Sequence, residues 1–294
     1  MIGLPDPETN WLAAAALLAL LGAIAFGAGG VGSLIGIGGG LFLVPILVLG
    51  FGFDIHLAVA ASLVAVVANS CGSAATYIEQ GTANLRIGIF LESATSVGGL
   101  AGALLAVTVF AARSSVLALA FVPLVAVAVV LMLRHPRVDA DPMAPSSALA
   151  ERWGLDGSYT NPSTGETVAY RATRPAAGLV LAGVAGVGSG LLGVGGGTFN
   201  VPAMNAVMNL PLRVATATST FKIGVTASAG ALVYFLAGDV VLWLAAPVAI
   251  GSLAGSVFAS ARQYRAPAGA LRALFVGVLI VAAALMALRG LGYY

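Results

Sequence analysis

Long apolar runs with almost no charge constrain this chain more than any other feature of its sequence. Residues 116–133 contain no charged side chain, and residues 271–288 contain only Arg272. Only 8% of the 294 residues are charged, whereas a soluble domain carries about 25%. Such runs are long enough to cross a bilayer, which takes about 20 apolar residues per helix. Transmembrane barrels instead alternate polar and apolar residues, so the sequence predicts an all-α polytopic membrane protein.

Charge and cysteine content argue against several other classes of protein. The formal net charge of +2 is too small to indicate nucleic-acid binding. The single cysteine, Cys71, allows no internal disulfide and no site of several thiolates. The sequence shows no Ser/His/Asp set, metal cluster or Walker loop, so we expect no enzyme, no metal and no cofactor. No Lys or Arg precedes Trp11, unlike the start of a signal peptide, so the first apolar run is expected to be a retained helix.

The chain contains two tandem copies of one unit. Gly36-Ile37-Gly38-Gly39-Gly40 returns 157 residues later as Gly193-Val194-Gly195-Gly196-Gly197. Further identities keep this offset: Pro45 and Pro202, Ala60 and Ala217, Ser62 and Ser219, Tyr77 and Tyr234, Gly81 and Gly238. At Leu100-Ala101-Gly102 and Leu253-Ala254-Gly255 the offset is 153, which predicts a deletion of four residues in a connecting loop. We expect a first membrane repeat over 1–134, a linker over 135–174 and a second repeat over 175–294.

Each copy is predicted to contain five helical segments. The expected segments are 11–36, 41–51, 57–79, 85–110 and 114–134, then 175–193, 198–208, 212–236, 239–261 and 268–290. In the linker, residues 158–170 have the pattern of two short strands around a turn. A small cytoplasmic β-hairpin is therefore expected there.

The distribution of arginine favours five crossings per copy over four. With five crossings and the start of the chain outside, ten arginines fall on the cytoplasmic side and only Arg113 and Arg289 fall outside. With four crossings the arginines divide seven to five. An odd number of crossings makes the second copy enter from the opposite side. We therefore expect two inverted repeats in a bacterial-type inner membrane, with both termini periplasmic.

The second segment of each copy is too short to span the membrane as a straight helix. Eleven helical residues rise only about 16 Å, against a hydrocarbon core of about 30 Å. We expect a short broken helix joined to Gly-rich backbone, which is tolerated at this depth only where protein buries it or where it lines a watery cavity. Inverted repeats with such broken helices near the midplane are a recurring plan of transporters.

The triple glycines are candidates for an anion site. They can adopt backbone angles that other residues avoid, and exposed N–H groups at such a bend can bind an anion. The alternative is close packing of helices, which we favour for the G-x-x-x-G pairs at 98–102 and 251–255. The candidate residues are Gly38, Gly39, Gly40, Gly195, Gly196 and Gly197.

Lys222 is the only lysine of the chain and lies inside the apolar segment 212–236. A cation at that depth costs at least about 2.5 kcal/mol and usually faces a cavity. Thr218, Ser219 and Lys222 share a helical face and would offer a positive charge and hydroxyl groups to an oxyanion. The alternatives are a lysine that snorkels to an interface or one that pairs with a buried acid such as Glu92. Glu92, the deepest of the acids, is also the candidate for proton coupling.

The first copy differs chemically at the corresponding place. Ala65 stands where the lysine would be, in a stretch that offers Ser62 and Asn69 as candidate ligands. Asn200 and Asn205 flank the second short segment. They either donate to a ligand or satisfy unwound backbone.

These residues resemble a known family of transporters. The run Gly36-Ile37-Gly38-Gly39-Gly40-Leu41-Phe42-Leu43-Val44-Pro45 precedes Ala60-Ala61-Ser62-Leu63, and Gly193-Val194-Gly195-Gly196-Gly197-Thr198-Phe199-Asn200-Val201-Pro202 precedes Ala217-Thr218-Ser219. This doubled pattern resembles the TauE/SafE family of sulfite exporters, within the toluene sulfonate uptake permease group, over roughly 11–134 and 175–290. The family often has Thr before the first serine, where this chain has Ala61. The resemblance implies a carrier of sulfite, sulfonates or related oxyanions and carboxylates, driven by proton or anion gradients.

The expected function is that of a secondary transporter that exports sulfite or small organosulfonate anions by alternating access. A passive anion channel and an importer of small carboxylates remain as alternatives. The expected partners are the small anion and the lipid bilayer, and the protein is a monomer or a homodimer. The expected binding site joins the two glycine bends with Ser62, Asn69, Asn200, Thr218, Ser219 and Lys222.

Overall fold

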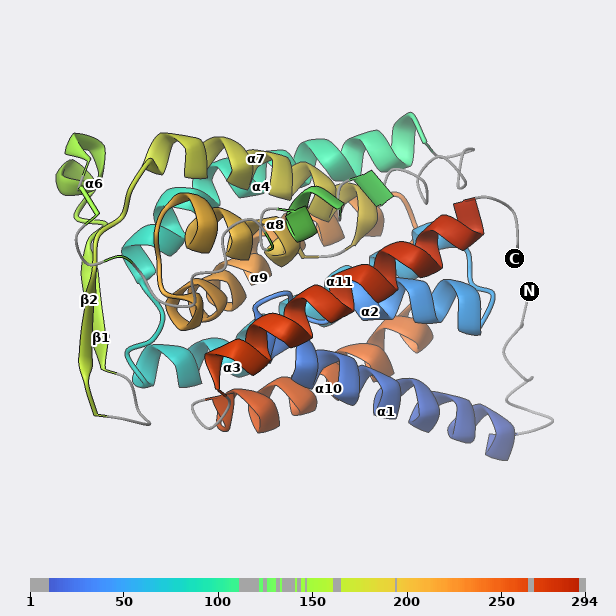
Figure 1. Ribbon diagram of the computed structural model, residues 1–294. Coiled ribbons are helices and arrows are strands. Elements are labelled where there is room, and N and C mark those ends of the chain that lie inside the picture. Colours follow the sequence, from blue (N-terminus) through green and yellow to red (C-terminus); the bar gives the residue numbers. More distant parts are fainter. Residues whose placement is uncertain are drawn as a thin grey trace.

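A computed structural model describes residues 11–110, 122–123, 126–130, 133, 141, 144–145, 147–160, 165–193, 195–263 and 267–290. Within this part of the chain, six helices are long and apolar enough to cross a membrane (Figure 1). They are α1 (Trp11–Ile35), α3 (Ile55–Glu79), α4 (Leu85–Thr108), α7 (Pro175–Leu192), α9 (Leu212–Leu236) and α10 (Leu242–Ser260). The prediction of an all-α membrane protein is confirmed, whereas most of the predicted segment 114–134 lies outside the described residues.

Two short broken helices occupy the predicted positions. Helix α2 (Gly40–Pro45) continues into a π-helical turn, η1 (Ile46–Gly50), and α8 (Gly197–Pro202) continues into η2 (Ala203–Val207). Each short helix begins after a glycine with a left-handed backbone, Gly39 at φ 83° and Gly196 at φ 73°. Each ends at a proline, which has no N–H to donate to the preceding turn, and a widened turn follows. The predicted segments therefore begin at the glycines, and the prolines mark the change from α-helix to π-helix inside them.

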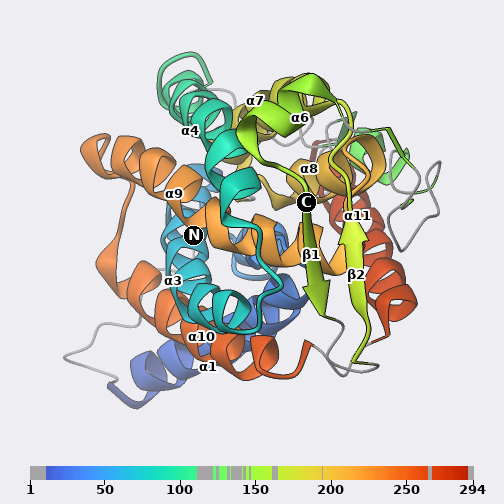
Figure 2. The same ribbon diagram turned by 90° about the vertical axis from the view of Figure 1, so that its left-hand side faces the viewer.

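The linker forms the predicted hairpin together with a short helix that the sequence did not predict. Strands β1 (Gly157–Thr160) and β2 (Thr167–Tyr170) pair antiparallel, and α6 (Ala148–Trp153) precedes them. Figure 2 shows the hairpin standing across one end of the helical bundle. Asn84 Nδ2, at the start of α4, donates to the Tyr170 hydroxyl oxygen at 2.8 Å. Burial raises the pKa of Tyr170, so this hydroxyl stays neutral as the acceptor.

The long helices of the two copies pack in exchanged pairs. Helix α1 lies along α10, and α4 lies along α7 (Figure 1). Small residues bring the backbones together: a Cβ on Gly186 would lie 2.0 Å from the Thr95 carbonyl oxygen, and one on Gly255 would lie 2.0 Å from the Phe26 carbonyl oxygen. The G-x-x-x-G glycines 98, 102, 251 and 255 all lie at these two interfaces. The packing role that was favoured for them is what the structure shows.

The offset between the copies stays at 157 residues through the whole described repeat. Helices α3 and α9 begin 157 residues apart, at Ile55 and Leu212, and α4 and α10 do so at Leu85 and Leu242. Gly98 faces α7 at Gly183, and its counterpart at this offset, Gly255, faces α1 at Phe26. The predicted deletion of four residues is therefore wrong. Small residues recur at one-turn spacing along these helices, and this spacing produced an apparent match shifted by four residues.

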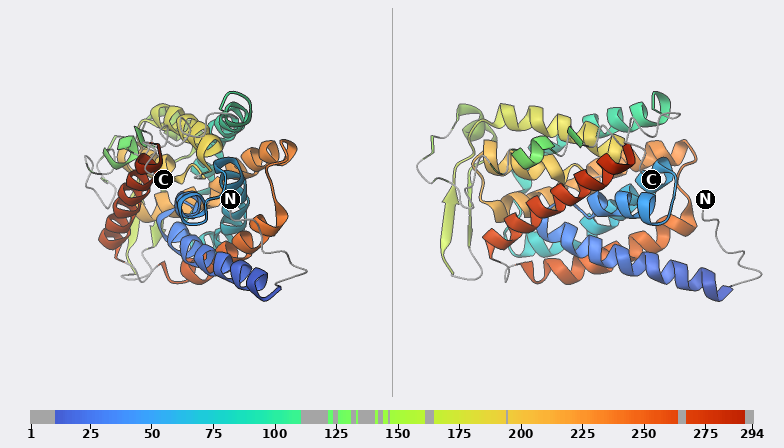
Figure 3. Two further views of the ribbon diagram at one scale, coloured as in Figure 1. Left: turned by 90° about the vertical axis from the view of Figure 1, so that its right-hand side faces the viewer. Right: turned by 45° about the vertical axis from the view of Figure 1, so that its right-hand side comes forward.

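The two broken segments reach opposite ends of the bundle. After η1, Phe53 contacts Trp243 at the start of α10. After η2, the main-chain oxygen of Met208 accepts from Thr173, which follows the hairpin. The start of α1 and the end of α11 (Ala268–Gly290) lie at the end away from the hairpin (Figures 1 and 3). The number of passes per copy and the inversion across a membrane stay predictions.

Candidate functional site

The two glycine bends meet in the centre of the molecule. A Cβ on Gly40 would lie 2.3 Å from the Gly193 carbonyl oxygen, and one on Gly197 would lie 2.1 Å from the Gly36 carbonyl oxygen. Gly38, Gly39, Gly195 and Gly196 all have left-handed backbones, with φ between 71° and 83°. Any side chain there would be strained as well as crowded. Gly40 and Gly197 therefore contact the bend of the other copy, whereas Gly39 and Gly196 pack against the preceding helix of their own copy.

Two serines fasten this contact reciprocally. Ser62 Oγ donates to the Gly193 carbonyl oxygen at 2.8 Å, and Ser219 Oγ donates to the Gly36 carbonyl oxygen at 2.6 Å. Each serine binds the bend of the other copy, at positions that correspond at the 157-residue offset. Such an exchange of equivalent contacts indicates a pseudo-two-fold axis through the centre. Both predicted ligand hydroxyls thus donate to peptide carbonyls in this conformation.

The two tyrosines that mark the repeat have a structural role that sequence reasoning did not assign. Tyr77 donates from its hydroxyl to the Ser33 carbonyl oxygen at 2.9 Å, and Tyr234 donates to the Gly190 carbonyl oxygen at 3.2 Å. Ser33 and Gly190 are again equivalent positions, near the ends of α1 and α7. The sequence could have indicated this role, because Tyr77 and Tyr234 are identical residues at the 157-residue offset. The tyrosines satisfy carbonyl groups that helix ends leave free.

Lys222 is buried in an ion pair between α9 and α4. Its Nζ lies 3.4 Å from Glu92 Oε2 and donates to Thr95 Oγ1 at 2.7 Å. The lysine side chain is completely enclosed, while 13% of the Glu92 side chain is exposed. Of the alternatives left open by the sequence, the structure shows the pairing with Glu92. Lys222 therefore contacts the Glu92 carboxylate and the Thr95 hydroxyl. The sequence had predicted the hydroxyls of Thr218 and Ser219 beside it.

Hydroxyl groups hold the other oxygen of the Glu92 carboxylate. Oε1 accepts from Ser96 Oγ at 2.5 Å and from Thr226 Oγ1 at 2.7 Å. Charge-assisted bonds of this kind are stronger than neutral ones. Together with Lys222, which forms an ion pair with Oε2, they place two hydroxyl donors and one cation around the carboxylate.

The symmetry-related place, between α3 of the first copy and α10 of the second, carries no charge. At the 157-residue offset, Lys222 corresponds to Ala65 and Glu92 to Ala249, so both members of the pair are alanine there. Thr226 corresponds to Asn69, whose Nδ2 donates to the Gly29 carbonyl oxygen at 2.7 Å. Each of the two symmetry-related places therefore contains either both charged residues or neither. Asn69 belongs to the neutral counterpart, and the structure does not bring it together with Lys222.

The remaining candidates lie apart from one another. Thr218 Oγ1 accepts from the Asn84 main-chain N–H at 2.9 Å, at the end of the bundle near the hairpin. Asn205 Nδ2 donates to the Leu210 carbonyl oxygen at 2.8 Å, so it satisfies backbone as the alternative reading proposed. Asn200 is fully buried, and neither of its amide atoms has a hydrogen-bond partner among the described residues. Of the predicted asparagines, only Asn200 keeps both amide atoms available.

Asn200 has polar neighbours with the same property. Ser189 Oγ and Thr198 Oγ1 are also buried without hydrogen-bond partners in the described part of the chain. A Cβ on Gly196 would lie 3.2 Å from Asn200 Nδ2 and 3.5 Å from Ser189 Cβ, so these two side chains flank the second glycine bend. Buried polar atoms are normally satisfied. These atoms supply hydrogen-bonding capacity beside the bend, which sequence reasoning recognised only for Asn200.

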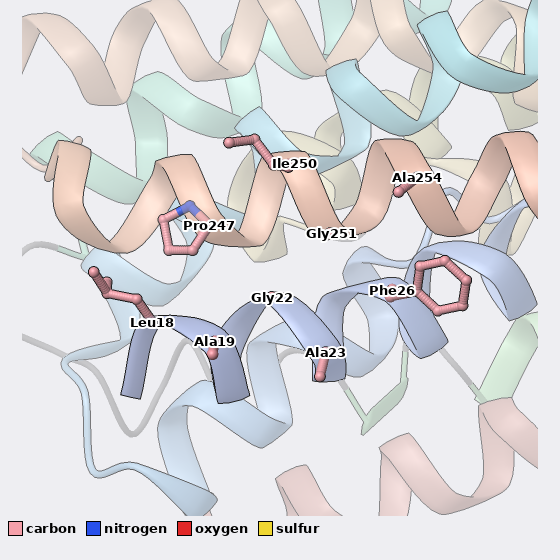
Figure 4. Close-up of a pocket in the computed structure, with 9 residues that line it drawn as sticks. All are labelled: Leu18, Ala19, Gly22, Ala23, Phe26, Pro247, Ile250, Gly251 and Ala254. Atoms are coloured by element: carbon pink, nitrogen blue, oxygen red, sulfur yellow. The ribbon is translucent and has the colours of Figure 1, made fainter. Parts of the chain in front are cut away.

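The outer surface carries an apolar groove between α1 and α10 (Figure 4). Its volume is about 620 Å³. It is lined by Leu18, Ala19, Gly22, Ala23, Phe26, Pro247, Ile250, Gly251 and Ala254. No candidate ligand belongs to this lining, and no side chain in it could hold an anion. The described residues likewise contain no group of three or more His, Cys, Asp or Glu that could hold a metal ion.

Apolar helices, broken central segments and a buried ion pair together define a multi-pass membrane protein of transporter type. The chain belongs to the Sulfite exporter TauE/SafE family, whose model matches residues 21–286. It is similar to the "Probable membrane transporter protein YunE" of Bacillus subtilis (strain 168), with 29% identity over 231 residues, which are 76% of this chain and 79% of the relative. No solved structure matches it. The expected resemblance is thus confirmed, and the family is one of membrane transporters rather than enzymes.

Proposed function

We propose that this protein is a secondary transporter that exports sulfite or small organosulfonate anions across a bacterial-type inner membrane by alternating access. The observation that carries the proposal is the ion pair of Lys222 and Glu92, buried between two membrane-spanning helices. Ionisable side chains inside the membrane are costly and usually serve ion or substrate pathways. The symmetry-related place, between Ala65 of the first copy and Ala249 of the second, lacks the pair, so folding of that half of the interface does not require it.

The centre of the molecule supports a carrier with two moving halves. The contacts of Gly40 with Gly193 and of Gly197 with Gly36 join the copies through two equivalent interfaces. Rocking about the pseudo-two-fold axis would open one interface toward one side while the other closes. The freed main-chain N–H groups would then face the substrate, and Asn200, beside the second bend, would add amide donors. The binding site would lean toward the second copy, where the charge and the unpaired polar atoms lie.

Transport by purified protein in proteoliposomes tests the proposal. We expect saturable uptake of labelled sulfite or sulfoacetate, with uptake accelerated when the same anion is loaded on the other side. Acceleration by internal substrate is a property of carriers, so its absence together with unsaturable flux would favour a passive anion channel. Flux of small carboxylates with rejection of both sulfur anions would favour the carboxylate importer. Protein-free liposomes measure the leak.

A further inference from the structure

The Glu92 carboxylate is bound within the protein as a ligand would be. Lys222 Nζ faces one oxygen at 3.4 Å, and the hydroxyls of Ser96 and Thr226 donate to the other. A cation and two hydroxyl donors around two oxygens of one monoanion are also what a sulfonate or hydrogen sulfite needs. Since the donors are already occupied, an incoming anion at Lys222 must replace Glu92.

We propose that Glu92 is a resident counter-ion of Lys222, and that a transported anion binds Lys222 together with one proton that neutralises Glu92. The inference rests on the proposed function and adds a proton as the ion that moves with the anion. Because the two move together, export is driven by the outward gradient of the anion itself, and an alkaline cytoplasm opposes it. In the balanced step, a proton from the water on the accessible side forms an O–H bond with the Glu92 carboxylate. The anion then pairs with the lysine that Glu92 has released.

Charge neutrality in a medium of low polarity links the two events. Lys222 with ionised Glu92 is neutral, and the addition of an anion alone would leave one uncompensated negative charge in the bundle. Lys222 with a bound anion and protonated Glu92 is neutral again. Because isolated charge is costly in such surroundings, the proton and the anion favour each other's binding. Reciprocity requires that each raise the affinity of the other by the same factor.

Other titratable groups on the surrounding helices are directed elsewhere. Helix α7 carries none. On α4, Arg86 points to the Gly154 carbonyl oxygen, and on α9, Arg213 donates to the Gln263 carbonyl oxygen near the hairpin end. Helix α3, which also packs against α9, carries His56, Cys71, Tyr77 and Glu79. His56 neighbours Tyr234 at the far end, Cys71 is exposed, Tyr77 donates to Ser33, and Glu79 is the last residue of the helix. Among the described residues, Glu92 is the acid placed to respond to a change at Lys222.

Lys222 and Glu92 differ in how deeply they are buried. The lysine is completely enclosed, whereas 13% of the Glu92 side chain is exposed, although its Oε2 is buried. The proton of the proposed step therefore binds the less enclosed member of the pair. The neutral acid retains the two hydroxyl neighbours, which can reorient to accept from it.

Calorimetry of anion binding by the full-length protein tests the inference. Binding is measured from about pH 5.5 to about pH 8.5, a range that runs from just above the ordinary carboxyl pKa to beyond neutrality. Methanesulfonate is the first probe because it stays a monoanion throughout, so that only the protein titrates; sulfite and sulfoacetate are the second and third. For the natural protein we expect affinity to fall by up to about tenfold per pH unit as the pH rises, with one proton taken up per anion. Glu92→Gln should bind at every pH with the affinity that the natural protein has only at low pH.

Matched variants separate the possible outcomes. Glu79→Gln, which removes an acid at a helix end, should keep the natural pH profile. Lys222→Ala combined with Glu92→Ala, which copies the symmetry-related pair Ala65 and Ala249, should fold and lose binding. If the natural protein binds all three anions without pH dependence, or if Glu92→Gln keeps the natural pH profile, the coupling is refuted while the proposed function stands. If the folded natural protein binds none of the three probes, the proposed function itself fails.

Discussion

Replacing Lys222 alone should destabilise the protein more than replacing both members of its ion pair. In Lys222→Met, a side chain of similar length fills the space, but Glu92 loses the positive charge that lies 3.4 Å away. The carboxylate must then remain as an unpaired buried charge or take up a proton. A buried pair that loses one partner loses roughly 3–5 kcal/mol, because the remaining charge is left uncompensated.

The surroundings of Glu92 lower that figure. Ser96 and Thr226 still donate to Oε1, and 13% of the side chain is exposed. We therefore expect Lys222→Met to lose about 2–4 kcal/mol of unfolding free energy at pH 7. The loss should shrink as the pH falls, because a bound proton removes the uncompensated charge.

A double-mutant cycle measures this energy. Lys222→Met, Glu92→Gln and the double variant are unfolded in micelles by increasing fractions of denaturing detergent, at about pH 7 and about pH 5. The double variant leaves no unpaired charge and should lie within about 2 kcal/mol of the natural protein. Equal losses for Lys222→Met and the double variant, or a loss independent of pH, would refute the reasoning.

Other parts of the structure make further predictions. Gly186→Leu should abolish folding, because its Cβ would lie 2.0 Å from a backbone carbonyl oxygen of α4. Gly27→Ala should fold normally, because nothing lies within 4 Å of the added Cβ. Size-exclusion profiles of fluorescent fusions distinguish the two variants. Tyr77→Phe and Tyr234→Phe should each lose about 1 kcal/mol in detergent unfolding, and very unequal losses would contradict the equivalence of the two contacts. Burial raises the pKa of Asp239. The charge of His56 lowers this pKa by a smaller amount, and the charge of Asp54 raises it further. The folded state therefore holds this proton more tightly than the unfolded state, and stability is lost as the pH rises through the folded pKa. Asp239→Asn should raise the Tm at about pH 8 and leave it unchanged near pH 4, and a lower Tm at the higher pH would contradict this assignment.

Element boundaries were highly predictable because local signals marked them. The segment predicted over 212–236 forms α9 over the same residues, between Pro211 and the turn at Gly238. The triple glycines mark the start of each broken helix, and the prolines five residues later mark the change from α-helix to π-helix within it. These features depend on neighbours in the sequence, and a single sequence contains them in full.

Contacts between distant residues were less predictable. Lys222 and Glu92 are 130 residues apart, and snorkelling, anion binding and pairing were all compatible with the lysine's depth. The serine hydroxyls were predicted as ligand donors, but each found a carbonyl of the opposite bend, which only the exchange of the two copies brings near. The offset error had a similar cause, since small residues repeated at each helical turn match in more than one register. The packing of one copy against the other decided each case.

Transport driven by a pH gradient tests the central claim, that this chain carries small anions with a proton, most directly. Proteoliposomes with an alkaline interior are held at zero membrane potential, and uptake of labelled methanesulfonate is followed against protein-free liposomes. We predict that the anion accumulates inside while the pH gradient lasts, and that a potential imposed at equal pH produces no accumulation. Accumulation that follows the potential at equal pH, or protein-dependent flux that ignores the pH gradient, would contradict the account.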